Sequence, residues 1–168
     1  AASDVYKRQV LDPVTNTVSA KHLNKHIDYS KLHTDNDPAV DAEIAAMRPH
    51  TLATPMQITS SSDGSTLYVA AFGSSKLGVF SASEIEDNNF DVNFDPTVAS
   101  ANYIGTAGGP SGFILDESNN KLYVMQRFDH SIAEIDIGSG STIATHSIAD
   151  PEPIDIVEGR KFLYDGLV

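Results

Sequence analysis

Apolar and polar residues alternate along much of this chain, and one alternating pattern occurs twice. Residues 55–80 align with residues 110–135 without a gap, so that the Leu-Tyr-Val triplets at 67–69 and 122–124 coincide. A period of two is typical of half-buried β-strands, because successive side chains point to opposite faces of a sheet. Each copy therefore predicts three antiparallel strands.

Polar turns separate these predicted strands. The stretches SSSDGS and DESNN follow the first strand of each copy, and GSS and FDHS follow the second. Asp, Asn, Ser and Gly are the residues that tight turns favour. The second copy continues through residues 138–148, which predict a further turn and a fourth strand. Residues 11–23 are of the same type and predict the last turn and outer strand of a preceding unit.

The repeating unit is thus a four-stranded antiparallel sheet of about 40 residues, which is the size of a propeller blade. One such sheet cannot bury both of its faces, and radial stacking of like sheets covers them. We predict an all-β fold, a partial β-propeller over residues 10–150 with about two complete four-stranded blades and part of a preceding one. The alternative is an unrelated pair of hairpins in a sandwich.

Two insertions separate the repeats. In residues 24–50, Asp37 precedes Pro38 as an N-cap, and the following PAVDAEIAAM predicts one short helix that ends before Pro49. Residues 84–102 predict a long surface loop between the third and fourth strands of the first copy. Propeller rim loops of this kind often carry function.

The composition excludes several classes of function. The chain has 168 residues, a net charge of −12 and no cysteine. An acidic surface repels phosphate backbones, so we expect no nucleic-acid partner. The absence of cysteine excludes disulfides, thiolate metal sites and a cysteine nucleophile within the chain. No apolar run approaches the roughly 18 residues of a membrane span, so none is expected.

One acidic stretch is reminiscent of a calcium-binding loop. Alternate positions carry oxygen ligands at Asp87, Asn89, Asp91, Asn93 and Asp95. Counted from Asp91, however, the sixth position is Pro96 and the twelfth is Asn102, where an EF-hand requires Gly and Glu. A solvated polar loop is the favoured interpretation, and cation binding at residues 87–95 stays open.

The histidines offer a second metal hypothesis. His22 and His26 are four residues apart, with His33 and His50 nearby, but their surroundings predict a strand and a loop instead of a helix. His130 falls in a predicted hairpin turn and His146 in a strand. Ordinary surface histidines are the favoured interpretation, and we predict no metal ligand.

No catalytic residue is predicted. Ser111 lies between glycines in GGPSGF, yet it enters a strand and its counterpart in the first copy is Met56, so it is no nucleophile elbow. Innermost propeller strands line the central channel, which places Met56, Gln57, Ser111 and Gly112 there. These residues weaken the hypothesis of a metal-dependent lactonase-type hydrolase, in which inner-strand carboxylates and Asn hold the ion.

The segments LYVAAFGSSKLGVF, LYVMQRFDHSIAEID and DPVTNTVSA resemble YVTN-type β-propeller repeats. The resemblance covers residues 11–148 and implies the propeller fold. Many functions occur on that fold, so a stand-alone YVTN propeller that binds a protein or an envelope component is one alternative.

The C-terminal stretch GRKFLYD resembles the segment that precedes the first Cys-x-x-Cys-His of di-haem cytochrome c peroxidase-like domains. This resemblance implies a bacterial secreted protein, periplasmic or extracellular, in which haem c and electron-transfer or peroxidase-like activity reside in a following C-terminal domain. Residues 151–168 would then be a linker. The residues at the domain junction would be Gly159, Arg160, Phe162, Tyr164 and Asp165. A degenerate first strand of another blade is the alternative.

The resemblance also sets the expected partners. These are the adjacent blades and the haem domain of the same parent chain, with a protein or envelope ligand as a further option. Residues 1–9 show no interpretable pattern and are interpreted as a non-native leader. Because the first and last blades of an incomplete ring expose apolar faces, we expect the isolated chain to be marginally stable or to self-associate.

Overall fold

The computed structural model describes residues 7–24, 42, 45, 48–86, 103–149 and 152–166. Within these residues the strands form one two-stranded hairpin and two four-stranded antiparallel sheets. The hairpin consists of β1 (Lys7–Asp12) and β2 (Thr17–His22). The first sheet, blade 1, has the order β3 (Pro55–Ser60), β4 (Thr66–Ala71), β5 (Lys76–Ser81) and β6 (Ile104–Gly105). The second, blade 2, consists of β7 (Pro110–Asp116), β8 (Lys121–Gln126), β9 (Ser131–Asp136) and β10 (Thr142–Ser147).

The internal repeat predicted from the sequence is confirmed at the level of single residues. The strands β4 and β5 become β8 and β9 when 55 is added to their first and last residue numbers. The strands β3 and β7 start 55 residues apart, and both have an irregular register in their first few residues. Strand order within each sheet follows the chain, as expected of a propeller blade.

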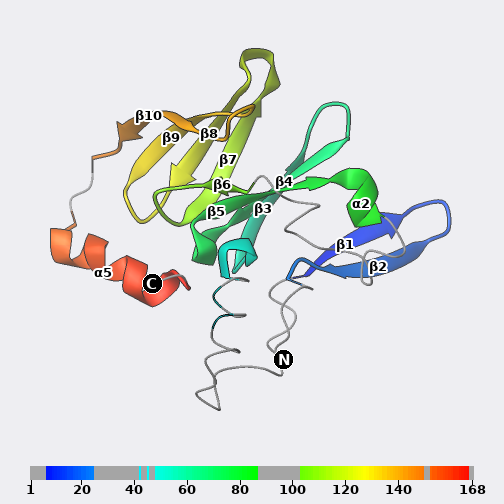
Figure 1. Cartoon of the computed structure of the whole chain (residues 1–168), viewed down its shortest axis with the longest axis horizontal. Helices are drawn as coiled ribbons and strands as arrows, with labels where there is room; N and C mark the ends of the chain where they lie inside the picture. Colours follow the sequence, from blue (N-terminus) through cyan, green and yellow to red (C-terminus); the bar gives the residue numbers. More distant parts are fainter. Residues whose placement is uncertain are drawn as a thin grey trace, which may run out of the picture.

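The three sheets stack side by side, and the apolar core lies in two layers between them (Figure 1). One layer joins the hairpin to blade 1 and contains Leu23, Val69 and Phe80. The other joins blade 1 to blade 2. It is built from Tyr68, Ala70, Leu77, Ile104, Phe113, Leu122, Val124, Ala133 and Ile135. Successive residues of β4 therefore pack in opposite layers, because side chains alternate between the two faces of a strand and both faces of β4 are buried.

A side chain links the first strands of the two blades. The Gln57 side chain on β3 donates to the Phe113 carbonyl on β7 and accepts from the Phe113 amide, both at 2.9 Å. It thus satisfies the backbone of β7, which is the edge strand of its sheet within the described residues. Gly112 makes room for this contact, because a Cβ there would lie 3.1 Å from Gln57 Oε1.

The turns repeat as well. Ser75 and His130, 55 residues apart, both adopt the left-handed conformation with φ of 48° and 45°. Thr54 and Gly109 form a second matched pair, each with φ of 50°. Glycine reaches this region at no steric cost, whereas a β-branched residue is strained there. In the first polar turn, hydrogen bonds from Ser61 and Ser65 lower the pKa of Asp63 to about 2.

Several sequence expectations need correction or fall outside the described residues. Residues 84–86 belong to a short helix, α2 (Ala82–Glu86), instead of the expected surface loop. Residues 154–164 of the expected linker form the helix α5 (Ile154–Tyr164). Strand β1 includes residues 7–9 of the supposed leader, although their origin stays a prediction. Of the helix expected after Asp37, only Ala42 and Ala45 are described, and both are helical.

Replacing Gln57 by Ala removes both hydrogen bonds between β3 and β7 and leaves the Phe113 amide and carbonyl without these partners. We expect the free energy of unfolding to fall by about 1–2 kcal/mol, measured by urea denaturation. Met56→Ala is the matched control, because the neighbouring Met56 side chain is 55% exposed. Equal losses in the two variants would contradict the role given to Gln57.

Thr54→Gly should raise the free energy of unfolding by about 0.5–1 kcal/mol, since it relieves the left-handed strain of an exposed β-branched residue. The reciprocal variant Gly109→Ala should lower it by more than about 2 kcal/mol. A Cβ at Gly109 would lie 2.8 Å from the Phe128 ring as well as in a strained conformation. Differential scanning calorimetry of the two variants measures these changes in the free energy of unfolding. A lower stability of Thr54→Gly would show that Thr54 is not strained.

Candidate functional site

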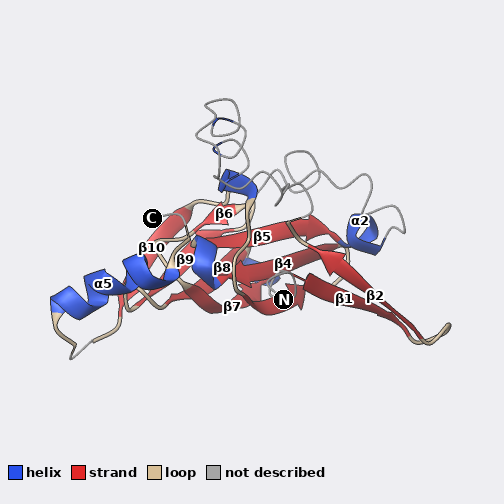
Figure 2. Cartoon of the chain, turned by 90° about the horizontal axis from the view of Figure 1, so that it is seen from below, coloured by secondary structure: helices blue, strands red, loops and turns tan. Residues whose placement is uncertain are grey.

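The helix α5 lies beside the ends of both blades, at the turns that join their second and third strands (Figure 2). Pro153 precedes the helix, Asp155 lies in its first turn and Lys161 in its last, an arrangement that suits the helix dipole. The helix ends where the Asp165 amide donates to the Lys161 carbonyl at 2.9 Å. One side of the helix contacts the blades. It carries Arg160, Lys161 and Tyr164, whose spacing places them together on a helix surface.

Three aromatic rings hold the C-terminal end of α5. Phe72 comes from the turn between β4 and β5, in the 3-10 segment η4 (Phe72–Ser74), and Phe128 comes from the turn between β8 and β9. Their centroids are 4.9 Å apart at a tilt of 71°, and Tyr164 lies 6.2 Å from Phe72 and 6.4 Å from Phe128. Phe128 is fully buried. One residue of α5 thus contacts both blades.

Ion pairs and hydrogen bonds fix the middle of α5 to blade 2. The Arg160 guanidinium pairs with Glu152 and contacts the His130 ring nitrogen Nε2. Because Arg160 can only donate, His130 accepts through Nε2. The Lys161 ammonium pairs with Asp129 Oδ1 at 2.8 Å. The second oxygen of Asp129, Oδ2, is buried without a hydrogen-bond partner.

The segment after α5 is fixed to blade 1. The Ser75 hydroxyl donates to Asp165 Oδ2 at 2.5 Å, and the Gly166 amide donates to the Gly73 carbonyl at 2.8 Å. The neighbouring Lys76 donates to the carbonyls of Pro49 and Thr51. Burial lowers the pKa of Lys76, and the Asp165 carboxylate opposes that shift.

We call the helix α5 and its contacts on the two blades the junction site. Of the five residues expected at a domain junction, Arg160, Tyr164 and Asp165 contact the blades. Phe162 points away and is 76% exposed, and nothing lies within 4 Å of a Cβ built on Gly159. The helix therefore has one face fixed to the propeller and leaves Phe162 and Leu163, which is 77% exposed, on its surface.

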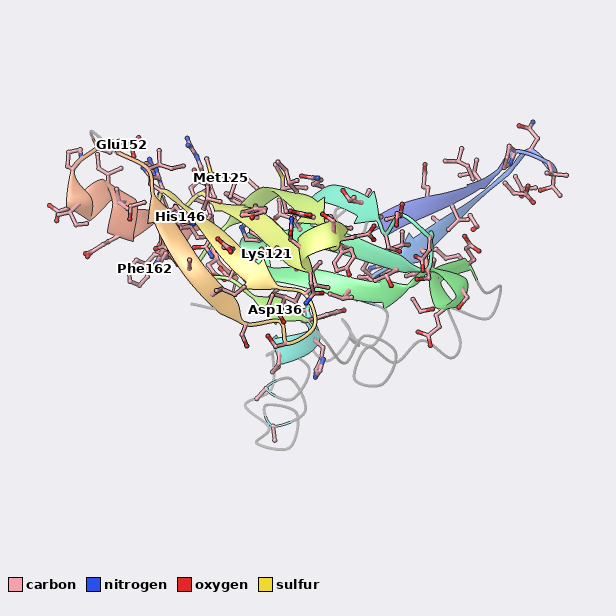
Figure 3. All side chains as sticks on the ribbon, turned by 90° about the horizontal axis from the view of Figure 1, so that it is seen from above. Lys121, Met125, Asp136, His146, Glu152 and Phe162 are labelled. Carbon is pink, nitrogen blue, oxygen red and sulfur yellow. The ribbon has the colours of Figure 1, made fainter. Side chains whose placement is uncertain are left out.

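A cavity of about 260 Å³ borders the junction site on blade 2. Its polar lining comes from Gln126, Arg127, His130 and Glu152, and its apolar lining from Met125, Ile148 and Ala149. In Figure 3 the labelled Met125 and Glu152 lie toward the α5 side of blade 2. Glu152 and His130, which line this cavity, both contact Arg160 of α5, so the cavity borders the helix through these two residues.

The other sequence candidates do not assemble into a site in the described part of the chain. The acidic stretch 87–95 and the residues His26 and His33 lie outside the described residues. His22 accepts from the Asn24 amide at 3.1 Å, and His50 packs against Tyr103. His146 lies 3.5 Å from Glu134. Among the described residues no group of three or more His, Cys, Asp or Glu side chains could hold a metal ion.

The residues expected near the channel lie on the first strand of each blade, and their position at a central channel stays a prediction. Met56 and Gln57 are on β3, and Ser111 and Gly112 are on β7. Ser111 stands at the irregular start of the edge strand β7, and not on a turn into a helix. No helix in the described part of the chain is long and apolar enough to cross a membrane.

Sequence reasoning missed the docking of α5. Its signal was present in PEPIDIVEGRKFLYD, where Arg160, Lys161 and Tyr164 recur at helical spacing after a proline. The aromatic partners were harder to find. Phe72 and Phe128 are not repeat equivalents, because Phe128 corresponds to Gly73.

No family model matches this sequence, and no curated protein matches it. Solved structures with similar folds include the Pseudomonas aeruginosa periplasmic gluconolactonase PpgL. It has a TM-score of 0.51 and 13% identity over 88% of this chain and 36% of that chain. This likeness supports the β-propeller fold.

Two further structures are similar at lower scores. The Swd1 (Cps50) β-propeller domain of Myceliophteria thermophila has a TM-score of 0.48 and 17% identity, over 86% of this chain and 37% of that one. Kuenenia stuttgartiensis hydrazine synthase has a TM-score of 0.45 and 20% identity, over 57% and 24%. The chain thus spans well under half the length of each of the three.

Replacing Tyr164 and Asp165 together by Ala removes the aromatic contact and the hydrogen bond from Ser75. We expect α5 to open locally and trypsin to cleave after Arg160 and Lys161 about tenfold faster or more. Phe162→Ala is the matched control, because its ring is exposed. Unchanged cleavage of the double variant would show that these contacts do not hold the helix.

Proposed function

We propose that this chain is the propeller scaffold of a larger secreted protein, in which α5 holds a following domain in a fixed orientation against the blades. That domain carries electron-transfer or peroxidase-like activity with haem c. The proposal places the protein in the periplasm or outside the cell and makes the propeller of the YVTN type. One observation carries it: the junction segment is a docked helix with contacts to both blades.

The contacts of α5 support a rigid connection. A free linker would let a following domain tumble, whereas Tyr164, Asp165 and Gly166, the last three described residues, are all held against the blades. A chain that leaves this point starts from a position fixed on blade 1. The exposed Phe162 and Leu163 provide an apolar surface next to that point.

The residues of this chain do not fit covalent haem themselves. Attachment of haem c requires cysteine thiols, and the chain has none. The chemistry therefore belongs to the following domain, and the contribution of this chain is binding and orientation. Its own side chains at the junction site position that domain and take part in no step of a reaction.

Two other functions remain as hypotheses. A stand-alone propeller would bind a protein or envelope component through its blades. A lactonase-type hydrolase has the fold of PpgL in its favour, but a likeness at 13% identity concerns the fold alone. Near the starts of β3 and β7, Met56, Gln57 and Ser111 offer a thioether, an amide and a hydroxyl group but no carboxylate, which does not favour a metal at this position.

Expression of the natural coding sequence, from residue 10 through the reading frame that follows residue 168, tests the proposal. In a host that attaches haem c, we expect a Soret absorbance band and haem that stays bound after denaturation. A control with the cysteines of the Cys-x-x-Cys-His motif replaced by Ala should lose both. A frame with further blades and no such motif would overturn the haem assignment and favour the binding module.

The docked geometry has its own test in the same protein. Small-angle scattering should give a compact particle for the parent protein and a larger radius of gyration for the Tyr164→Ala/Asp165→Ala variant. Ile154→Ala, which changes a side chain that is 65% exposed, serves as the control. The same radius of gyration for all three proteins would contradict an orienting role of α5.

A further inference from the structure

The two faces of a blade differ, and the internal repeat shows which face is which. The face of blade 1 that packs on blade 2 carries Tyr68, Ala70 and Leu77 in its core, with Val79 packed beside them. Adding 55 to these numbers gives Tyr123, Met125, Ile132 and Glu134 of blade 2. These four residues, together with Ile114, form what we call the open face of blade 2.

No described sheet covers the open face. Ile114 is 69% exposed, and Tyr123, Met125 and Ile132 are partly exposed. The strand register places Ile114 beside Tyr123 and Met125 beside Ile132, so the apolar side chains form two adjacent rows on one side of the sheet. The equivalent face of blade 1 is buried against blade 2. The open face of blade 2 is therefore the kind of surface that packs on a neighbouring sheet.

The charged groups on the open face are already paired with one another. The Lys121 ammonium pairs with Glu134 at 2.5 Å, and His146 lies 3.5 Å from the same carboxyl group. The hydrogen bond from Lys121 lowers the pKa of Glu134. Figure 3 shows Lys121, Met125 and His146 across this blade. A covering partner would therefore leave no unpaired carboxylate at the interface.

The hairpin of β1 and β2 exposes the complementary kind of face. Leu11 pairs with Val18 on its outer side, and these residues are 70% and 58% exposed. Val10 points to the opposite side and packs in the core against blade 1. In the alignment of residues 11–23 with 135–148, Leu11 corresponds to Ile135, which is fully buried on the blade 2 face that packs on blade 1.

We propose that the open face of blade 2 binds the outer face of the β1–β2 hairpin of a second copy of this chain. The contact continues the interface between blade 1 and blade 2, with Leu11 of the second copy in the position that Ile135 takes there. It is a head-to-tail contact between two different faces, so each copy keeps one free face after binding. The proposal rests on the repeat and is independent of the proposed haem function.

Analytical ultracentrifugation of the 168-residue chain over a concentration series tests this contact. We expect the weight-average mass to rise above 18.0 kDa with concentration. Ile132→Lys disables the open face, and Leu11→Lys disables the hairpin face, so each variant alone should stay a monomer. Both changes add the same charge, so the variants cannot attract each other through the new residues.

The decisive experiment is the mixture of the two variants. Ile132→Lys keeps an intact hairpin face and Leu11→Lys keeps an intact open face, so the mixture should form 1:1 dimers and nothing larger. Val14→Lys is the control, because Val14 is 92% exposed in the hairpin turn and should associate as the unchanged chain does. If Ile132→Lys fails to fold, Ile114→Lys on the same face replaces it.

Three results would overturn the proposal. The first is an unchanged chain that stays monomeric at all concentrations. The second is self-association of Leu11→Lys with loss in Ile132→Lys, which would indicate two open faces in contact. The third is a mixture of folded variants that forms no dimer.

Discussion

The packing of one sheet face on the next is the constraint on which the whole molecule depends. A four-stranded antiparallel sheet with strands such as β4, in which consecutive residues are apolar, has apolar side chains on both faces, and it is stable only when both are covered. Between blade 1 and blade 2 this contact buries Leu77, Leu122, Val124 and Ile135 completely. Each such side chain contributes about 1.5–3 kcal/mol, so the layer outweighs single hydrogen bonds such as those of Gln57.

This constraint also explains why the two ends of the blades differ. The polar turns at one end, with Asp63 and Asp116, satisfy themselves through hydrogen bonds with nearby Ser and Asn residues. At the other end, Phe72 and Phe128 present aromatic rings that a turn cannot cover alone. The ring of Tyr164 packs against both, so α5 is attached to both blades at this point.

The sequence predicted the sheets well because their physics is local and periodic. A gapless repeat at 55 residues located strands β3 to β5 and β7 to β9, and the turn residues located the bends between them. It did not predict Gln57 as a link between β3 and β7, because a side chain that bonds the backbone of another blade leaves no periodic signal. It missed the docking of α5 because the partners, Phe128 and Ser75, are distant along the chain. The acidic stretch 87–95 lies outside the described residues, so its cation hypothesis stays a prediction.

The contact between Tyr68 and Phe113 is the most direct measure of blade stacking, because these rings come from adjacent blades with centroids 6.4 Å apart. Nuclear Overhauser spectroscopy with selectively labelled aromatic rings measures that proximity in solution. Radial stacking predicts strong cross-peaks between Tyr68 and Phe113 and none between Phe113 and Tyr123, which faces the other side of blade 2. Cross-peaks from Phe113 to Tyr123, with none to Tyr68, would contradict the stacked-blade fold.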